Sequence, residues 1–451
     1  MKKLFFQSRK LMAVSALAAA VGSLSPLALA ADGKLVVVTS FPSDLTKIFK
    51  AAFEAENPGI ELEVLNKKTS ASIKYIEETA GNNKSDLFWA SAPDAFEVLK
   101  GKELLEQYRT RATGIPETIG AFPIHDPDGY YSGFAAAGYG IMWNERYLKA
   151  KNLPAPAEWS DLEKPVYFEH VGMSAPSRSG TTHLTVETIL QGEGWNEGWA
   201  TLKRMAGNFK SVTERSFGVP DGVNSGNFGI GVVIDFFGLS SKGAGFPVEF
   251  KYPSTTALVP ANIGIVKNAP NRESAVDFIE FLLSDKGQEL LLDPKIRRLP
   301  VNPKTYEKAP AGFPNPFNDG ELSASLHFDL DTSKSRYNLV NALFDVMITY
   351  RMDDLRRATK QIHDAEAMLA KSPNVEAAQM VGRAKDLIAQ IPVTEDKAAD
   401  PEFLAAFTSS RKKATDKTTG RQAEIEAMWD EFARNNYREA AALAEQAQEL
   451  L

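Results

Sequence analysis

The sequence predicts an α/β protein that carries an all-helical extension at its C-terminal end. Short β-branched runs, such as Val36-Val37-Val38, are typical of buried strands, and helical spacing of apolar residues follows them. This alternation of strands and helices predicts a mainly parallel sheet covered by helices. A separate observation predicts the extension: strand signals vanish after Ser323, and residues 336–369, 375–391 and 420–450 have the pattern of helices with charged faces.

The predicted elements follow one another from residue 34 onward. Residues 34–40 form the first strand, and Ser43 or Asp44 is the predicted N-cap of a helix that Pro58-Gly59 ends. The next elements are a strand at 60–65, a helix at 72–79, a strand at 86–90 and a helix from about residue 94. A second βα series spans 139–260 and includes a strand at 230–235; a strand at 262–266 and a helix that runs to residue 292 complete the pattern.

The first thirty residues have the features of a signal peptide. Four basic residues precede an apolar run, which ends at the small-residue site Ala28-Leu29-Ala30. Ser23, Ser25 and Pro26 interrupt this run, so it is too short and too broken for a membrane-spanning helix. We expect cleavage after residue 30, a mature chain that begins at Ala31, and location in the periplasm.

Composition excludes several classes of protein. The chain has no cysteine, which excludes disulfides, thiol nucleophiles, zinc–thiolate sites and a lipid anchor on an N-terminal cysteine. Its net charge of −7 argues against general nucleic-acid binding, which needs a basic face. A hydrophobic content of 43% with 24% charged residues is typical of a globular protein. No apolar stretch after the signal peptide is long enough for direct membrane insertion.

Three predicted strand-to-helix loops are rich in hydroxyl groups, and ligands bind at such loops in βα sheets. They are residues 39–43, 90–93 and 174–182. In the third loop, hydroxyls and one guanidinium surround a glycine at the start of a predicted helix, which suits a phosphate or carboxylate. Helix capping and an exposed turn arginine are the structural alternatives. The candidate ligand-binding residues are Ser40, Ser43, Ser91, Ser177, Arg178, Ser179, Gly180, Thr181, Thr182, Arg215 and Asp235.

The sequence leaves the roles of two of these candidates open. Asp235 ends an apolar strand and is either a cleft carboxylate or a partner of backbone amides, and Arg215 precedes a turn. No enzyme motif is present: Gly222-Val-Asn-Ser-Gly226 lacks the nucleophile-elbow spacing, and there is no P-loop. The five histidines are scattered, so we expect no metal or other cofactor: His125, His170, His183, His327 and His363.

The chain resembles the family 1 extracellular solute-binding proteins of ABC transporters. The resemblance covers residues 34 to about 320 and rests on the segments KLVVVTSFPSDL, FEAENPGIELE, SDLFWASAPDAFEVL and NRESAVDFIEFLLSDKGQELL. Two more specific segments, GYYSGFAAAGYGIMWN and SAPSRSGTTHLTVETILQGEGW, look like the branch that contains phosphoglycerate transport regulatory proteins and sugar-phosphate-binding proteins.

This resemblance implies a two-lobed clamp of the type II periplasmic-binding-protein class that holds a ligand phosphate with its hydroxyl loops and makes or breaks no bond. We expect lobe 1 at 31–137 and 265–320, lobe 2 at 138–264 and the helical extension at 321–451, with crossing strands near 137 and 265. The implied ligand is a phosphoglycerate, phosphoenolpyruvate or a sugar phosphate. The implied partner is an ABC permease or a sensor histidine kinase, and we expect a monomer.

Three other functions compete with this interpretation. A ferric-ion binder of the broader family uses adjacent tyrosines in its second lobe, but the only such pair here, Tyr130-Tyr131, precedes lobe 2. A hydrolase would need a base beside a nucleophile, and His183 is the one candidate. A pure interaction protein is suggested by the extension, which either is an added module or belongs to the core.

Overall fold

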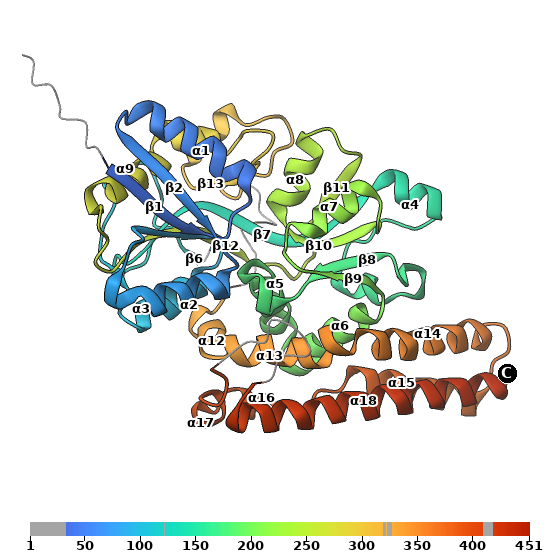
Figure 1. The fold of residues 1–451 in the computed structure, drawn as a ribbon. Coiled ribbons are helices and arrows are strands. Elements are labelled where there is room, and N and C mark those ends of the chain that lie inside the picture. Colours follow the sequence, from blue (N-terminus) through green and yellow to red (C-terminus); the bar gives the residue numbers. More distant parts are fainter. Residues whose placement is uncertain (1–32, 121, 319–321, 323–326, 409–417) are drawn as a thin grey trace, which may run out of the picture.

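The computed structural model describes residues 33–120, 122–318, 322, 327–408 and 418–451. The predicted signal peptide and the expected start at Ala31 lie outside these described residues. Figure 1 shows two α/β lobes side by side and a layer of long helices that runs beneath them. The predicted α/β class and the helical extension are therefore confirmed.

Lobe 1 is built on strands in the order β2-β1-β3-β12-β7. β1 pairs in parallel with β2 and β3, whereas β12 runs antiparallel to both β3 and β7. The elements of lobe 1 are β1 (Gly33–Thr39), α1 (Ser43–Glu56), β2 (Ile60–Asn66), α2 (Thr69–Thr79), β3 (Leu87–Ala90), α3 (Pro93–Gly101), β4 (Leu105–Glu106), β5 (Thr118–Ile119), β6 (Phe122–Pro123), β12 (Leu258–Val266), α9 (Arg272–Leu283), α10 (Asp285–Leu290) and β13 (Leu299–Pro300).

Lobe 2 continues the same sheet in the order β7-β10-β8-β9, with β11 also paired to β7. Strands β8, β9 and β10 are parallel, so their carboxyl ends meet at one edge. Its elements are β7 (Ser132–Asn144), which both lobes share, α4 (Glu145–Lys151), β8 (Val171–Ser174), η4 (Pro176–Arg178), α5 (Gly180–Glu193), α6 (Trp195–Gly207), β9 (Phe209–Thr213), α7 (Gly218–Ser225), β10 (Ile230–Ile234), α8 (Asp235–Gly243) and β11 (Val248–Lys251).

Strand β7 connects the lobes. Up to Gly138 it pairs with β12 in lobe 1, and from Tyr139 onward it pairs with β10 and β11 in lobe 2. This change of partner lies beside the expected crossing near 137. Strand β12 pairs with the lobe 1 half of β7 from Leu258 onward. The antiparallel crossing strands make the sheet mixed.

The helical extension comprises α12 (Leu330–Ser335), α13 (Tyr337–Met347), α14 (Met352–Leu369), α15 (Val375–Ala389), α16 (Glu395–Ala398), α17 (Pro401–Leu404) and α18 (Gly420–Glu449). The long α18 packs along α14 and α15, and these two pack on α6 of lobe 2 (Figure 1). Trp195 of α6 donates its indole N–H to the carbonyl of Val393 at 2.8 Å. The apolar side chains of lobe 2 and the extension form one continuous core. The extension is therefore part of the folded body.

Two predicted helices are each broken in the structure, and the N-cap prediction for α1 is wrong. The helix predicted to end at residue 292 breaks at Ser284, whose hydroxyl accepts from Gly287 N and starts α10. The helix predicted over 336–369 breaks after Met347, whose carbonyl accepts from Tyr437 Oη at 2.7 Å. Helix α1 begins at Ser43, and Pro42 occupies its N-cap position without a side-chain cap.

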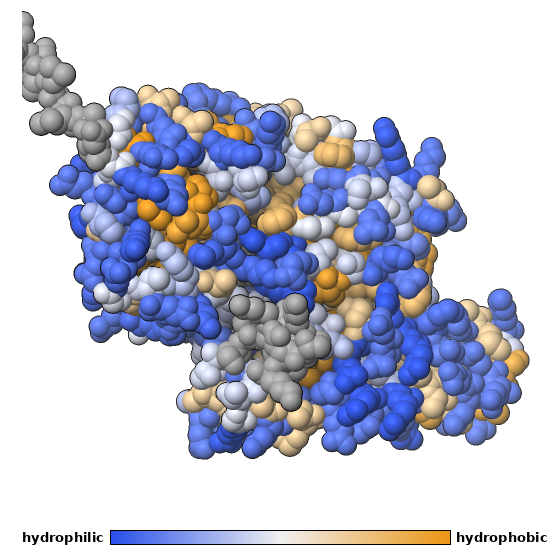
Figure 2. Space-filling view, viewed as in Figure 1, coloured by the Kyte–Doolittle hydropathy of each residue, from blue (hydrophilic) through white to orange (hydrophobic). Residues whose placement is uncertain are grey.

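No helix in the described part of the chain is long and apolar enough to cross a membrane. Figure 2 shows a mostly hydrophilic face over the helical extension. Exposed ion pairs, such as Lys360 with Asp364, lie on α14.

Candidate functional site

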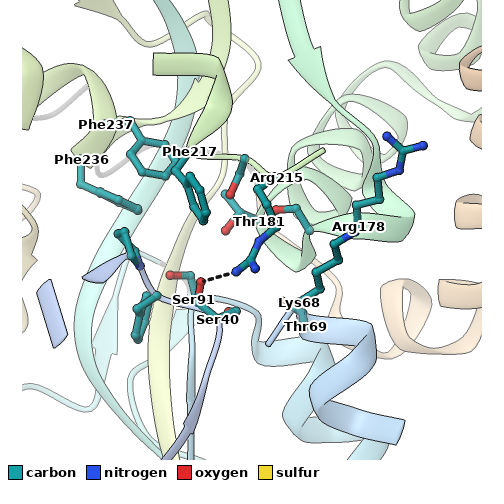
Figure 3. A pocket seen from close by; sticks show the side chains of 14 residues that line it. Ser40, Lys68, Thr69, Ser91, Arg178, Thr181, Arg215, Phe217, Phe236 and Phe237 are labelled. Atoms are coloured by element: carbon teal, nitrogen blue, oxygen red, sulfur yellow. Dashed lines mark hydrogen bonds between the residues drawn. The ribbon is translucent and has the colours of Figure 1, made fainter. Parts of the chain in front are cut away.

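A cleft lies between the two lobes at the carboxyl ends of their parallel strands. Lobe 1 contributes the loops after β1, β2 and β3, and lobe 2 contributes the loops after β8, β9 and β10. We call this the interlobe cleft and define it by its lining residues: Ser40, Phe41, Pro42, Lys68, Thr69, Ser91, Arg178, Ser179, Thr181, Arg215, Ser216, Phe217, Phe236 and Phe237 (Figure 3). The sheet topology thus brings the hydroxyl loops together, as expected for βα units.

Six of the eleven candidate residues line the interlobe cleft, namely Ser40, Ser91, Arg178, Ser179, Thr181 and Arg215. The other five do not: Ser43, Ser177, Gly180, Thr182 and Asp235. Ser43 is exposed at the start of α1, whereas Ser177 and Thr182 are buried beneath the loop.

The two lobes touch each other around the cleft. Ser70 of α2 donates its hydroxyl to the carbonyl of Ser177 at 3.0 Å, and Lys68 forms an ion pair with Glu214 across the gap. The cleft itself is narrow, with a volume of about 20 Å³, and a hollow of about 420 Å³ adjoins it at Phe217, Phe236 and Phe237. The lobes therefore touch on the Lys68 and Ser177 side of the cleft and leave a hollow between them on the side of Phe217, Phe236 and Phe237.

Gly180 permits this close approach. A Cβ atom at this position would lie 2.6 Å from the Ala92 side chain and 2.9 Å from that of Thr69, both in lobe 1. The amide of Gly180 donates to Thr69 Oγ1 at 3.2 Å, and the amide of Thr182 donates to Ser179 Oγ at 3.2 Å. Two amides at the α5 N-terminus, those of Gly180 and Thr182, are thus bonded within the protein.

The two candidate arginines point in different directions. The guanidinium of Arg215 points toward Ser40 and Ser91 (Figure 3), and its Nη2 lies 3.2 Å from Asn66 Oδ1 of lobe 1. The guanidinium of Arg178 lies at the edge of the cleft, points away from these serines and pairs with Glu214 at 3.2 Å. Partial burial lowers the pKa of Arg215 below its usual range.

Glu214 forms ion pairs with Lys68 and Arg178 at the edge of the cleft, and we call these two residues the rim cations. Partial burial acts to raise its pKa, but the hydrogen bond from Lys68 and the charges of Arg178 and Arg215 lower it overall. The carboxylate therefore stays ionised and partly neutralises the rim of the cleft.

Asp235 is a partner of backbone amides, which is one of the two roles that its sequence position left open. Its carboxylate accepts from Gly138 N at 2.7 Å, Phe236 N at 2.7 Å and Tyr252 Oη at 2.9 Å. Burial raises its pKa to about 6. Because Gly138 is the residue where β7 changes lobes, Asp235 fixes the crossing strand.

Sequence reasoning missed two cationic residues at the cleft. Lys68 follows β2 in a further strand-to-helix loop, where the hydroxyls of Thr69 and Ser70 were an available signal. Arg298 comes from the segment before β13 and is completely buried behind the cleft. Its Nη1 donates to Ser91 Oγ at 3.1 Å, and burial lowers its pKa to about 9.

His183, the possible base of a hydrolase, does not line the cleft. It is fully buried, and its ring contacts Asp94 Oδ2 at 3.3 Å and Asn341 Oδ1 at 2.9 Å. Its nitrogens are thus engaged by lobe 1 and the extension. Of the adjacent tyrosines, Tyr131 is buried and donates its hydroxyl to Glu97 at 2.6 Å. Within the described ranges, no group of three or more His, Asp or Glu side chains is placed to hold a metal ion.

Known proteins resemble this chain over most of its length. The phosphoglycerate transport regulatory protein PgtC of Salmonella typhimurium is 30% identical over 382 residues, which cover 83% of this chain and 89% of PgtC. The aligned 83% of this chain is more than residues 1–320 make up, so the similarity continues into the helical extension. The iron uptake protein A1 of Synechocystis is 25% identical over 277 residues, 56% of this chain and 73% of that protein.

A solved structure confirms the fold. The periplasmic binding protein AfuA from Actinobacillus pleuropneumoniae, with fructose-6-phosphate bound, superposes with a TM-score of 0.64 at 19% identity. The superposition covers 71% of this chain and 99% of AfuA. Residues 82–322 match the family described as bacterial extracellular solute-binding protein. With this match and the similarity to PgtC, the chain belongs to the bacterial extracellular solute-binding protein family and is a solute-binding protein, not an enzyme.

Proposed function

We propose that this protein captures a small phosphorylated organic anion in the periplasm and passes it to a membrane partner. The candidate ligands are a phosphoglycerate, phosphoenolpyruvate or a sugar phosphate. The observation that carries the proposal is the lining of the interlobe cleft, where hydroxyls and cationic side chains from both lobes converge. Hydroxyls and guanidinium groups are the donors that suit phosphate oxygens.

The relatives support the same ligand class. PgtC is named for phosphoglycerate transport, and AfuA holds fructose-6-phosphate. We infer that the lobes of the present protein separate about the crossing strands β7 and β12, admit the ligand and close on it. The closed form then meets an ABC permease or a sensor histidine kinase.

The compartment is part of the proposal. The basic start, the broken apolar run and Ala28-Leu29-Ala30 support export and cleavage before Ala31. N-terminal sequencing of the periplasmic fraction should find Ala31 as the first residue. A retained Met1 would show that the segment is not removed.

The ligand is best identified by native mass spectrometry of protein purified without refolding, followed by titration calorimetry. The calorimetric panel contains 3-phosphoglycerate, phosphoenolpyruvate, fructose 6-phosphate and the unphosphorylated glycerate and fructose. We expect tight binding of at least one phosphorylated compound and none of its unphosphorylated counterpart. Equal binding of both counterparts would contradict the role of the phosphate.

A ferric-ion binder is the alternative function. It needs a cluster of tyrosine, histidine and carboxylate ligands in the cleft, whereas the cleft lining contains hydroxyls, cations and phenylalanines. We expect purified protein to carry no stoichiometric iron and to keep its ligand affinity after chelator treatment. A stoichiometric iron signal would favour the alternative.

A further inference from the structure

Arg298 lies immediately behind the wall of the interlobe cleft. Its guanidinium lies 3.5 Å from the ring centroid of Phe236 and 4.4 Å from that of Phe41. Both rings line the cleft, one from each lobe. The side chain is completely buried, so this charge is removed from solvent.

The hydrogen bonds of Arg298 are incomplete. A guanidinium carries five N–H donors, and here Nη1 donates to Ser91 Oγ. Nε and Nη2 are buried and have no acceptor among the described residues. Buried polar groups are nearly always paired in folded proteins, so such unpaired donors require an explanation.

No carboxylate in the described part of the chain forms an ion pair with Arg298. Asp235 is close enough to interact electrostatically, but its oxygens already accept from two amides and Tyr252. The hydroxyl of Tyr139, also close to Arg298, is buried and has no partner among the residues that the structure describes. By contrast, Glu214 already pairs with Lys68 and Arg178 at the rim.

Ser91 connects this buried charge to the cleft. Its Oγ accepts from Arg298, and no described residue accepts its hydroxyl proton in return. The proton can therefore be donated to a ligand oxygen, and the neighbouring positive charge makes the hydroxyl a stronger donor.

We propose that Arg298 and Ser91 form one unit that holds the anionic head group of the ligand at the base of the interlobe cleft, deeper than the rim cations. Ser91 contacts the head group, and Arg298 orients Ser91 and supplies the charge. The ligand class is a compact tetrahedral oxyanion, phosphate or phosphonate, on an organic body. This proposal rests on the proposed function, and it places the phosphate of the ligand next to the Ser91 hydroxyl.

A structural role for Arg298, as a spacer between the rings of Phe41 and Phe236, makes a different prediction. As a spacer, Arg298 would matter for folding and ring packing, whereas Ser91 would not matter for ligand affinity. A double-mutant cycle on the two residues separates these roles, because side chains that act together give non-additive losses.

The experiment is titration calorimetry of the parent, Ser91→Ala, Arg298→Gln and the double variant with 3-phosphoglycerate and fructose 6-phosphate. We expect each single variant to lose about tenfold or more in affinity, the size expected for a charge-assisted hydrogen bond. The double variant should lose no more than Arg298→Gln alone. Arg297→Gln is the matched control, because Arg297 lies outside the cleft, over the ring of Phe313. It should bind like the parent.

The outcomes are distinguishable. Parent affinity in Ser91→Ala, or independent losses that add in the double variant, would overturn the proposal and leave the proposed function standing. If the parent binds neither probe nor any other phosphorylated compound of the panel, the proposed function fails and this assignment fails with it. Circular dichroism checks each fold, and if Arg298→Gln is unfolded, Ser91→Ala alone decides.

Discussion

Polar side chains gather at two places where the lobes meet, and the two differ in how completely they are paired. In the interlobe cleft, Arg298 keeps two unpaired nitrogens, and Ser91 keeps a hydroxyl proton without an acceptor among the described residues. The second place, which we call the buried junction, consists of Asp94 of α3, His183 of α5, Ser333 of α12 and Asn341 of α13. Its four side chains are buried, and hydrogen bonds connect them to one another.

The difference indicates two tasks for the same strand-to-helix connections. Ser91 faces the cleft, and Asp94, three residues later, joins the buried junction. Thr181 faces the cleft, and His183, two residues later, contacts the extension. In each strand-to-helix connection, one residue thus lines the cleft, where it can contact a ligand. A residue two or three positions later contacts the helical extension. The ligand loops and the helical extension are thus joined through the buried junction.

Breaking the buried junction should have the largest effect. We expect His183→Ala to lose about 3–5 kcal/mol of unfolding free energy, because a large, fully buried ring is removed and the polar groups that it contacts lose a partner. The ring of Tyr337, whose centroid lies 4.3 Å from that of His183, also loses its contact. Urea unfolding measures the loss. His327→Ala, at an exposed position, is the control and should unfold like the parent. Equal stability of the two variants would show that the junction does not hold the lobes.

The pH dependence of stability tests the same junction. Burial raises the pKa of Asp94 from 3.8 to about 6, so the folded protein binds this proton more tightly than the unfolded chain. Its stabilising contribution is then complete below the unfolded pKa and lost as the pH rises through the folded pKa. Asp94→Asn cannot ionise, so its stability should rise relative to the parent over this window, by a shift on the order of 3 kcal/mol. Unfolding curves of both proteins across the window measure it. Curves that stay parallel would contradict a raised pKa at Asp94.

The sequence was sufficient to predict the meeting of the hydroxyl loops, because the carboxyl ends of parallel strands share one edge of the sheet. The α/β class and the helical extension followed from local periodicity alone. Arg298 could not be found in this way, since its role depends on two rings, Phe41 and Phe236, that are distant in sequence. The break after Met347 likewise depends on Tyr437, 90 residues away. Such features arise from tertiary packing and leave no local pattern.

The two arginines of the cleft lining, Arg178 and Arg215, test the ligand side of the molecule. We expect Arg215→Ala to lose about ten- to a hundredfold in affinity, the range for a hydrogen bond from a charged group. Arg215 points toward Ser40 and Ser91, whereas Arg178 points away and already pairs with Glu214 (Figure 3). Arg178→Ala should therefore lose less, about tenfold at most. Arg178→Lys should recover only part of that loss, since an ammonium cannot make the planar two-point contact.

Calorimetry with 3-phosphoglycerate and fructose 6-phosphate ranks these variants, and unfolding curves should show that each loop variant keeps its stability within about 0.5 kcal/mol. A larger loss in Arg178→Ala than in Arg215→Ala would mean that the two arginines lie differently in the ligand-bound cleft than in the cleft seen here.

The smallest expected effect comes from Glu214, which acts on the ligand in two opposed ways. Its carboxylate repels an anion, but its ion pair with Lys68 also holds the lobes together. The Glu214 side chain is 63% exposed, and exposed ion pairs contribute only about 0–1 kcal/mol. We therefore expect repulsion to be the larger effect, and Glu214→Gln should gain roughly two- to fivefold in affinity at low salt. The gain should vanish at high salt, because screening weakens exposed charges. Glu249→Gln, which breaks an exposed pair with Lys242 away from the cleft lining, is the matched control. An affinity that falls in Glu214→Gln at both salt concentrations would show that closing the lobes through Lys68 matters more than repulsion.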